Sequence, residues 1–104
     1  MAQRLEFHNI LRTLADNVYF QPPENIQIQY PCIVYKRDTA ITEFADNLPH
    51  MSSIGYEVTI IDRDPDSLIL GKVSALPMCL FDRHFVADSL NHDVFKIHWK
   101  GMAA

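Results

Sequence analysis

The sequence predicts an α+β domain in which two helices lie on one face of a four-stranded, mainly antiparallel sheet, in the order α-β-β-α-β-β. The first observation is a stretch near the N-terminus whose apolar residues have helical spacing, and the second is a set of short stretches in which apolar and polar residues alternate. The third is a proline or a turn sequence after most of these stretches. A two-layer arrangement buries the apolar face of every element.

The composition is that of one folded domain. The chain has 104 residues, of which 48% are apolar and 21% charged, enough apolar material for a core. Two independent cores would leave each half near the ~40-residue limit for unaided folding. We therefore expect a single domain over residues 1–104, with a loose tail at about 101–104.

Charge and hydropathy exclude some partners. The net charge is -4, and only Lys36 and Arg37 are adjacent basic residues, so a face for duplex DNA is not expected. No apolar run approaches the ~20 residues that span a bilayer, and no signal peptide is visible. The sequence thus predicts no membrane contact and assembly in the cytoplasm.

The N-terminal part begins with a predicted helix. Within residues 3–17 and just beyond, apolar residues recur every three or four positions, at Phe7, Ile10, Leu11, Leu14 and Val18. After an extended connection at 21–23, the stretch Pro31–Arg37 predicts the first strand. Residues 38–52 follow neither period and are either a long loop or two irregular strand extensions.

The second half alternates strand, helix and hairpin. From Tyr56 the strict two-residue period predicts a strand. A short helix follows, capped by Asp64 or Ser67 and weakened by Gly71, with an apolar face at Ile69, Val73 and Leu76.

Residues 79–99 predict a hairpin. Its strands are Met78–Ala87 and a stretch ending in Phe95, Ile97 and Trp99, joined by a turn at residues 88–93 that includes Asn91, His92 and Asp93. Arg83 breaks the alternation, which a bulge or an exposed edge would explain. The aromatic stripe at the end fits a core better than a base-stacking platform, because basic residues do not accompany it.

The acidic cluster after the second strand is either a cation site or a structural corner. A calcium loop beginning at Asp62 would need Gly and Glu where Ser67 and Val73 stand, so the pattern fails. A strand-to-helix turn explains the cluster better, because carboxylates and hydroxyls there accept hydrogen bonds from backbone amides. We assign this structural role to Asp62, Asp64, Pro65, Asp66 and Ser67.

Catalytic signatures are missing from the sequence. His84, His92 and Asp93 could meet across the hairpin and bind a metal or transfer protons, but they lack metal-type spacing. The cysteines Cys32 and Cys79 are either free buried thiols or a bridge between adjacent strands. We assign no catalytic residue, no metal ligand and no cofactor.

Several strings together resemble one family of virion proteins. The chain is similar to the tail terminator or tail completion proteins of long-tailed bacteriophages and prophages, also described as minor capsid or head-tail joining proteins. The resemblance covers about residues 5–99, and none of its motifs is catalytic. The strings are Tyr30-Pro31-Cys32-Ile33-Val34-Tyr35, Phe44-Ala45-Asp46-Asn47 with Pro49, Tyr56 to Ser67, Leu76-Pro77-Met78-Cys79 with Phe81-Asp82-Arg83, and Leu90-Asn91-His92-Asp93-Val94-Phe95.

This resemblance implies a structural protein and not an enzyme. Such a subunit forms a ring with copies of itself, commonly a hexamer, on the last ring of tail-tube protein. The ring stops tail growth and offers a surface to the head connector and neck proteins, and DNA only passes through its lumen. The implied location is the tail end of the virion, after assembly in the bacterial cytoplasm.

The irregular segment is the predicted contact surface of such a ring. It mixes polar and apolar residues, as interfaces do, and three acids, Asp38, Glu43 and Asp46, are expected to face the lumen and keep DNA from adhering. The interface candidates are Thr39, Ile41, Glu43, Phe44, Asp46, Asn47, Leu48, His50 and Met51.

Two other functions remain open from the sequence. A head-closure or neck adaptor protein of the connector would need similar contact surfaces. A small metal-dependent hydrolase, from a different class, would use Asp62, Asp64, His84, His92 and Asp93.

Overall fold

A computed structural model describes residues 2–45 and 48–99, with side chains for residues 4–38 and 54–99. The expected loose tail at 101–104 lies outside this part of the chain. None of the described helices is long and apolar enough to cross a membrane. The elements are α1 (Ala2–Leu14), β1 (Val18–Phe20), β2 (Cys32–Ala45), β3 (Leu48–Asp62), α2 (Leu68–Ser74), β4 (Cys79–Ala87) and β5 (Leu90–Trp99).

The fold class is α+β as predicted, but the expected four-stranded sheet is wrong in detail. The sheet has five strands in the order β1-β2-β3-β5-β4, and β1 is parallel to β2 while all other pairs are antiparallel. The extra strand β1 begins at Val18, which was expected on the helix. Because Val18, Tyr19 and Phe20 are β-branched or aromatic, they favour a strand once α1 ends at Leu14.

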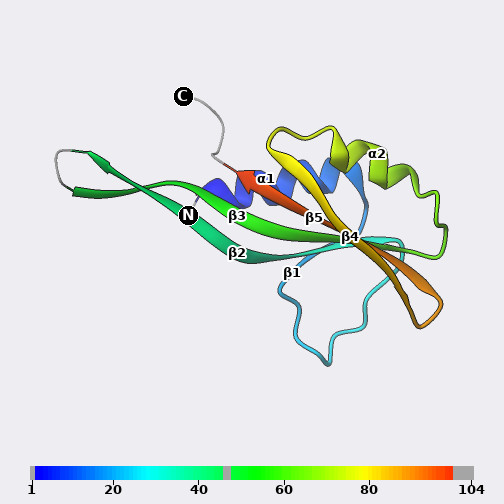
Figure 1. The fold of residues 1–104 in the computed structure, drawn as a ribbon. Coiled ribbons are helices and arrows are strands. Elements are labelled where there is room, and N and C mark those ends of the chain that lie inside the picture. The colour runs from blue at the N-terminus through cyan, green and yellow to red at the C-terminus, as the bar shows by residue number, and fades with distance from the viewer. Residues whose placement is uncertain (1, 46–47, 100–104) are drawn as a thin grey trace.

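Both helices lie on the same face of the sheet (Figure 1), as predicted. Phe7 and Leu11 of α1 and Val73 of α2 are fully buried there against the alternate residues of the central strands. We call this side the helix face and the other side the open face. The buried helix-face residues of the strands are Ile33, Tyr35, Tyr56, Val58, Ile60, Phe95, Ile97 and Trp99.

The core is centred on Phe7. Its ring lies 4.8 Å from the ring centroid of Tyr56, 5.4 Å from that of Trp99 and 5.5 Å from that of Tyr35. The hydroxyl of Tyr35 is hydrogen-bonded to Nδ1 of His8 at 2.7 Å, so its polar end is satisfied at the edge of the core. The aromatic stripe ending in Trp99 is therefore core, as predicted.

For the segment 38–52, the described residues 38–45 and 48–52 confirm the second of the two predicted alternatives, a pair of strand extensions. Strands β2 and β3 stay paired from Thr39↔Gly55 to Ala45↔Leu48, whereas β5 pairs with β3 only as far as Ile54. The paired backbone of residues 40–45 and 48–53, which we call the arm, therefore extends beyond the sheet (Figure 1). It contributes to principal extents of 51 × 28 × 23 Å.

The predicted hairpin at 79–99 is confirmed, but its turn is shorter than expected. Asp88 and Ser89 have φ of 53° and 62°, the positive values typical of a two-residue hairpin turn. These two residues connect the paired residues Ala87 and Leu90. The placement of Asn91, His92 and Asp93 in the turn is therefore wrong, since all three belong to β5. The irregularity expected around Arg83 is confirmed as a bulge, because the register shifts between Phe81 and Arg83.

Candidate functional site

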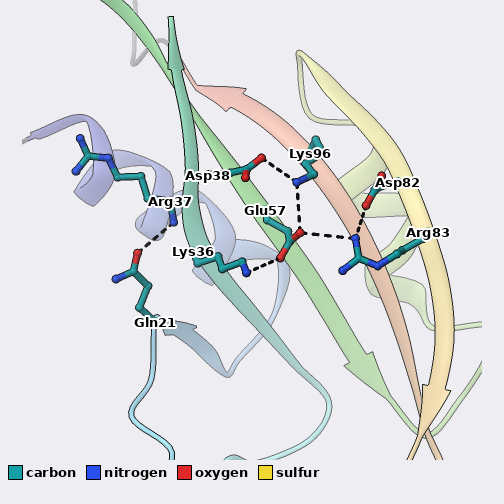
Figure 2. A network of polar contacts seen from close by, with 8 residues as sticks. All are labelled: Gln21, Lys36, Arg37, Asp38, Glu57, Asp82, Arg83 and Lys96. Carbon is teal, nitrogen blue, oxygen red and sulfur yellow. Dashed lines mark hydrogen bonds and ion pairs between the residues drawn. The ribbon is translucent and has the colours of Figure 1, made fainter.

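The open face carries a network of charges centred on Glu57. This residue lies in β3 between its cross-strand neighbours Lys36 of β2 and Lys96 of β5. Its carboxylate oxygens are 3.2 Å from Nζ of Lys36, 3.3 Å from Nζ of Lys96 and 3.7 Å from the Arg83 guanidinium of β4. One carboxylate thus joins cations from the three other long strands (Figure 2).

Two further acids complete the network. Lys96 also donates to Asp38 Oδ2 at 2.8 Å, and Arg83 pairs with Asp82. Three cations and three carboxylates therefore compensate one another. Cross-strand pairs of opposite charge stabilise a sheet and fix its register, so the network suits a rigid surface better than an anion-binding site.

The electrostatics show which state Glu57 is in. Desolvation alone would raise the pKa of its carboxyl group, but hydrogen bonds from Lys36 and Lys96 and the positive charge of both residues lower the pKa below its ordinary value. The pKa of Lys96 is raised, first by its hydrogen bond to Asp38 and then by that to Glu57. Glu57 is therefore ionised at neutral pH and fully engaged as an acceptor, which is unlike a general base.

Replacing Glu57 by glutamine is expected to lower the free energy of unfolding by about 1–2 kcal/mol at pH 7. The side chain is only 13% exposed, and the neutral amide leaves the two lysines without their shared counter-charge. Because the pKa is lowered on folding, this stabilisation is present above the ordinary glutamate pKa and is lost as pH falls through the folded value.

Urea unfolding of both proteins between pH 7 and 3 measures this effect. The difference between wild type and Glu57→Gln is expected to shrink on acidification, while Glu24→Gln, at an exposed position between β1 and β2, should match wild type throughout. If the free energies of unfolding of the two proteins differ by the same amount from pH 7 to 3, the charge of the Glu57 carboxylate does not stabilise the fold.

A groove lies beside this network. It has a volume of about 450 Å³ and is formed where the chain leaving β1 passes over β2 and β3. Its lining includes Gln21, Pro22, Val34, Lys36, Glu57 and Thr59. Since Lys36 and Glu57 are already paired with each other, the groove offers a polar, electrically balanced wall and not a cluster of free charge.

The outer edge of the sheet is the second notable surface. Strand β4 has no neighbour on its outer side among the described strands, and its side chains are mostly exposed. Four large apolar residues are exposed along it: Leu80, Phe81, Phe85 and Val86. An exposed edge strand with apolar side chains is a surface prepared for contact with another chain. The sequence offered an exposed edge only as one of two explanations for Arg83, because the apolar residues on either side of it would also suit a buried strand.

Most of the predicted interface candidates belong to the arm, and the structure describes only part of them. The backbone of Thr39, Ile41, Glu43, Phe44, Leu48, His50 and Met51 lies in β2 or β3, and their side chains lie outside the described part. Asp46 and Asn47 lie outside the described residues altogether. Of the three acids expected at the lumen, Asp38 is described, and it is paired with Lys96.

The acidic cluster forms the corner between β3 and α2. The carboxylate of Asp62 accepts from the backbone N–H of Asp64 at 3.0 Å, and that of Asp64 accepts from the N–H of Asp66 at 2.9 Å. Ser67 is the N-cap of α2 and accepts from the N–H of Ile69 at 3.3 Å. Asn91 holds the corner from β5 by donating to the carbonyl oxygens of Asp62 and Arg63. These side-chain oxygens accept hydrogen bonds from backbone amides and so stabilise the turn, as predicted.

The histidines considered for catalysis do not converge. His84 pairs with Asp93, whereas His92 pairs with Phe85 and stacks on its ring with centroids 4.6 Å apart. Since neighbouring residues of a strand point to opposite faces, His92 lies across the sheet from His84 and Asp93. Burial raises the pKa of Asp93. Among the described side chains, no group of three potential ligands is placed to hold a metal ion.

The cysteines are free and far apart. Cys32 is in β2 and Cys79 in β4, with β3 and β5 between them, so the usual strand spacing alone separates them by at least roughly 14 Å. A disulfide needs Cα atoms within about 7 Å, so the bridge considered from the sequence is excluded in this fold. Burial raises the pKa of Cys32 to about 12, which makes it an unreactive thiol.

Comparison with known proteins adds no relative. The chain matches no protein-family model, no curated protein and no solved structure.

Proposed function

We propose that this chain is a structural subunit that acts as a tail terminator of a long-tailed bacteriophage or prophage. It assembles with copies of itself into a ring on the end of the tail tube, stops tube growth and offers the joining surface to the head connector. The proposal rests on the sequence resemblance and on one structural observation above all, the arm that extends beyond the sheet.

The arm supports the proposal because a ring subunit needs a projecting contact. Phe44 and Ala45, the first two residues of the string Phe44-Ala45-Asp46-Asn47 that belongs to the resemblance, are the last two residues of β2 in the arm. The sequence has no Lys or Arg between Arg37 and Arg63, so the formal charge of the arm is the single negative charge of Glu43. That charge would keep passing DNA from adhering to a lumen lined by the arm.

The remaining exposed surface supports a head-to-tail ring. In a closed ring each subunit presents two different patches, one to each neighbour. The arm and the apolar β4 edge are two different surfaces of this kind, built from different parts of the sheet. The charge network centred on Glu57 would keep the sheet between them rigid.

Polymerisation of tail-tube protein in the presence of this chain tests the proposal. We expect the chain to join tube ends as a ring, visible by electron microscopy and with a multimeric mass by native mass spectrometry, and to halt elongation. A chain that neither binds tube ends nor changes tube length would contradict the proposal. Binding to the head connector without binding to tubes would instead assign the chain to the neck adaptor proteins.

A further inference from the structure

Along the outer side of β4, regularly spaced backbone groups have no partner among the described residues. The N–H of His98 donates to the carbonyl of Met78 at 3.2 Å, which makes Met78 and His98 a hydrogen-bonded pair of the β4–β5 ladder. Because such pairs alternate along an antiparallel ladder and the bulge follows Phe81, the backbone groups of Cys79, Phe81, His84 and Val86 point outward. Four residues are thus available to pair with a further strand.

The exposed apolar area along this edge is large for so small a chain. Met78 is 56% exposed, Leu80 70%, Phe81 58%, Phe85 40% and Val86 62%. Since one phenylalanine carries roughly 150–250 Å², these five side chains expose on the order of 500–600 Å². That approaches the ~800 Å² that each partner contributes to a stable interface. The strand has no proline or lysine, and the features that could protect this edge, the bulge and the charges of Asp82 and Arg83, are confined to its middle.

We propose that the β4 edge is covered by the β4 edge of a second copy of this chain, which pairs with it antiparallel around a two-fold axis between Asp82 and Arg83. The sequence of β4 is self-complementary about this point. Asp82 then lies opposite Arg83 of the second copy, and Leu80 lies opposite Phe85 of the second copy. The reciprocal contacts follow from the symmetry.

The pairing is consistent with the faces of the strand. Leu80 and Phe85 pair with Lys96 and His92 of β5, so both lie on the open face. Phe81 and His84, which also become opposite, both lie on the helix face. The bulge lies on the two-fold axis, so it shifts the pattern of outward-pointing residues in the same way in both copies. Each residue whose backbone groups point outward therefore faces a residue of the second copy whose backbone groups also point outward.

Charge complementarity selects this register. Arg83 is 52% exposed and Asp82 is 35% exposed, so both can reach a second chain. Two copies bring together two arginines and two aspartates in alternation around the axis. A register shifted by two residues would separate these charges and place Leu80 opposite Arg83 of the second copy.

This inference stands independently of the proposed function, because it concerns the chain before it meets a tail tube. A β4 edge covered by a second copy cannot at the same time contact a neighbour in a ring, so the dimer would have to open during ring assembly. A chain that caps tubes but is monomeric when free contradicts this inference alone. A dimer that never caps tubes contradicts the proposed function alone.

Sedimentation velocity at about 10–200 µM tests the dimer, because this concentration range populates the dimer even if its dissociation constant is micromolar, the weak end for such interfaces. We expect a dimer that D82R and R83D each weaken at least about tenfold, because each places like charges opposite one another. The exchange D82R/R83D restores opposite charges and is expected to restore the dimer, and E24K should behave as wild type. Circular dichroism of each variant verifies that it is folded.

A disulfide between the copies tests the register. Leu80 and Phe85 of the second copy form a non-hydrogen-bonded pair with Cβ atoms about 4.5–5.5 Å apart. The double variant L80C/F85C is therefore expected to form a covalent dimer on mild oxidation, whereas L80C and F85C alone are not. A monomeric wild type at 200 µM, folded reversal variants that still dimerise, a folded exchange variant that stays monomeric, or a dimer that L80C/F85C fails to link would each overturn the proposal.

Discussion

Replacing Phe7 by alanine is expected to lower the free energy of unfolding by about 3–5 kcal/mol, a large part of the 5–15 kcal/mol of a typical domain. Phe7 is fully buried, and its ring contacts the rings of Tyr35, Tyr56 and Trp99 from β2, β3 and β5. Its loss opens a cavity where α1 meets the sheet, because the three aromatic rings that contact Phe7 cannot close over the vacated space without moving the helix.

Urea or thermal unfolding followed by tryptophan fluorescence measures the change, since Trp99 is the single tryptophan and lies against Phe7. Leu5→Ala is the matched control, because Leu5 is in the same helix and 50% exposed, and it should cost less than about 1 kcal/mol. Equal losses from the two variants would show that α1 does not pack through Phe7.

Shortening the arm is expected to abolish ring formation and tube capping while leaving the fold intact. Residues 42–52 can be replaced by Asn-Gly between the paired residues Ile41 and Ser53, because a two-residue turn of this sequence closes such a pair. In the described sheet β5 pairs with β3 only as far as Ile54, so the two strands of the arm pair with each other and with no third strand. The free energy of unfolding should therefore change by less than about 1 kcal/mol.

Two readouts separate fold from function in this variant. Circular dichroism and urea unfolding report the fold, and electron microscopy of tail tubes polymerised with the variant reports capping. A shortened chain that still caps tubes would show that the arm is not needed for capping. A matched substitution outside the arm, Glu24→Gln, is expected to cap tubes normally, because it neutralises an exposed charge between β1 and β2 and leaves the arm unchanged.

The sequence predicted those elements in which apolar residues recur with one helical or strand period along the whole element. The helical spacing of Phe7 and Leu11 and the strict alternation from Tyr56 produced α1 and the inner part of β3 as expected. Strand β1 was missed because it has only three residues and Val18 continues the helical spacing. Its pairing is confirmed by bonds to distant residues, such as that from the N–H of Gln21 to the carbonyl of Tyr35.

The arm could not be distinguished from a loop because two irregularities interrupt its alternation. Asp38 is an extra residue in β2, and Ser52 is an extra residue in β3. After each extra residue, the side chains that follow in the strand lie on the opposite face of the sheet from the one that strict alternation predicts. Neither a helical nor a strand period therefore continues across the segment. The alternation resumes only inside the sheet, where three strands fix the register.

The charge network was missed for a different reason. Lys36, Glu57 and Lys96 come from three strands separated by more than 20 residues of sequence, and each alone resembles an ordinary exposed charge. Their convergence depends on the strand order and on the register. The acidic corner, by contrast, is local, and a spacing of two residues was enough to identify the aspartates whose side chains accept from backbone amides.

Electron microscopy of phage particles assembled without this chain tests the tail-terminator proposal most directly. Without a terminator, tube polymerisation has no stop and no joining surface, so we expect tails of uncontrolled length together with unattached, filled heads. Restoring the wild-type chain should return tails of one length joined to heads. Particles that have normal tail lengths and joined heads without this chain would contradict the proposal.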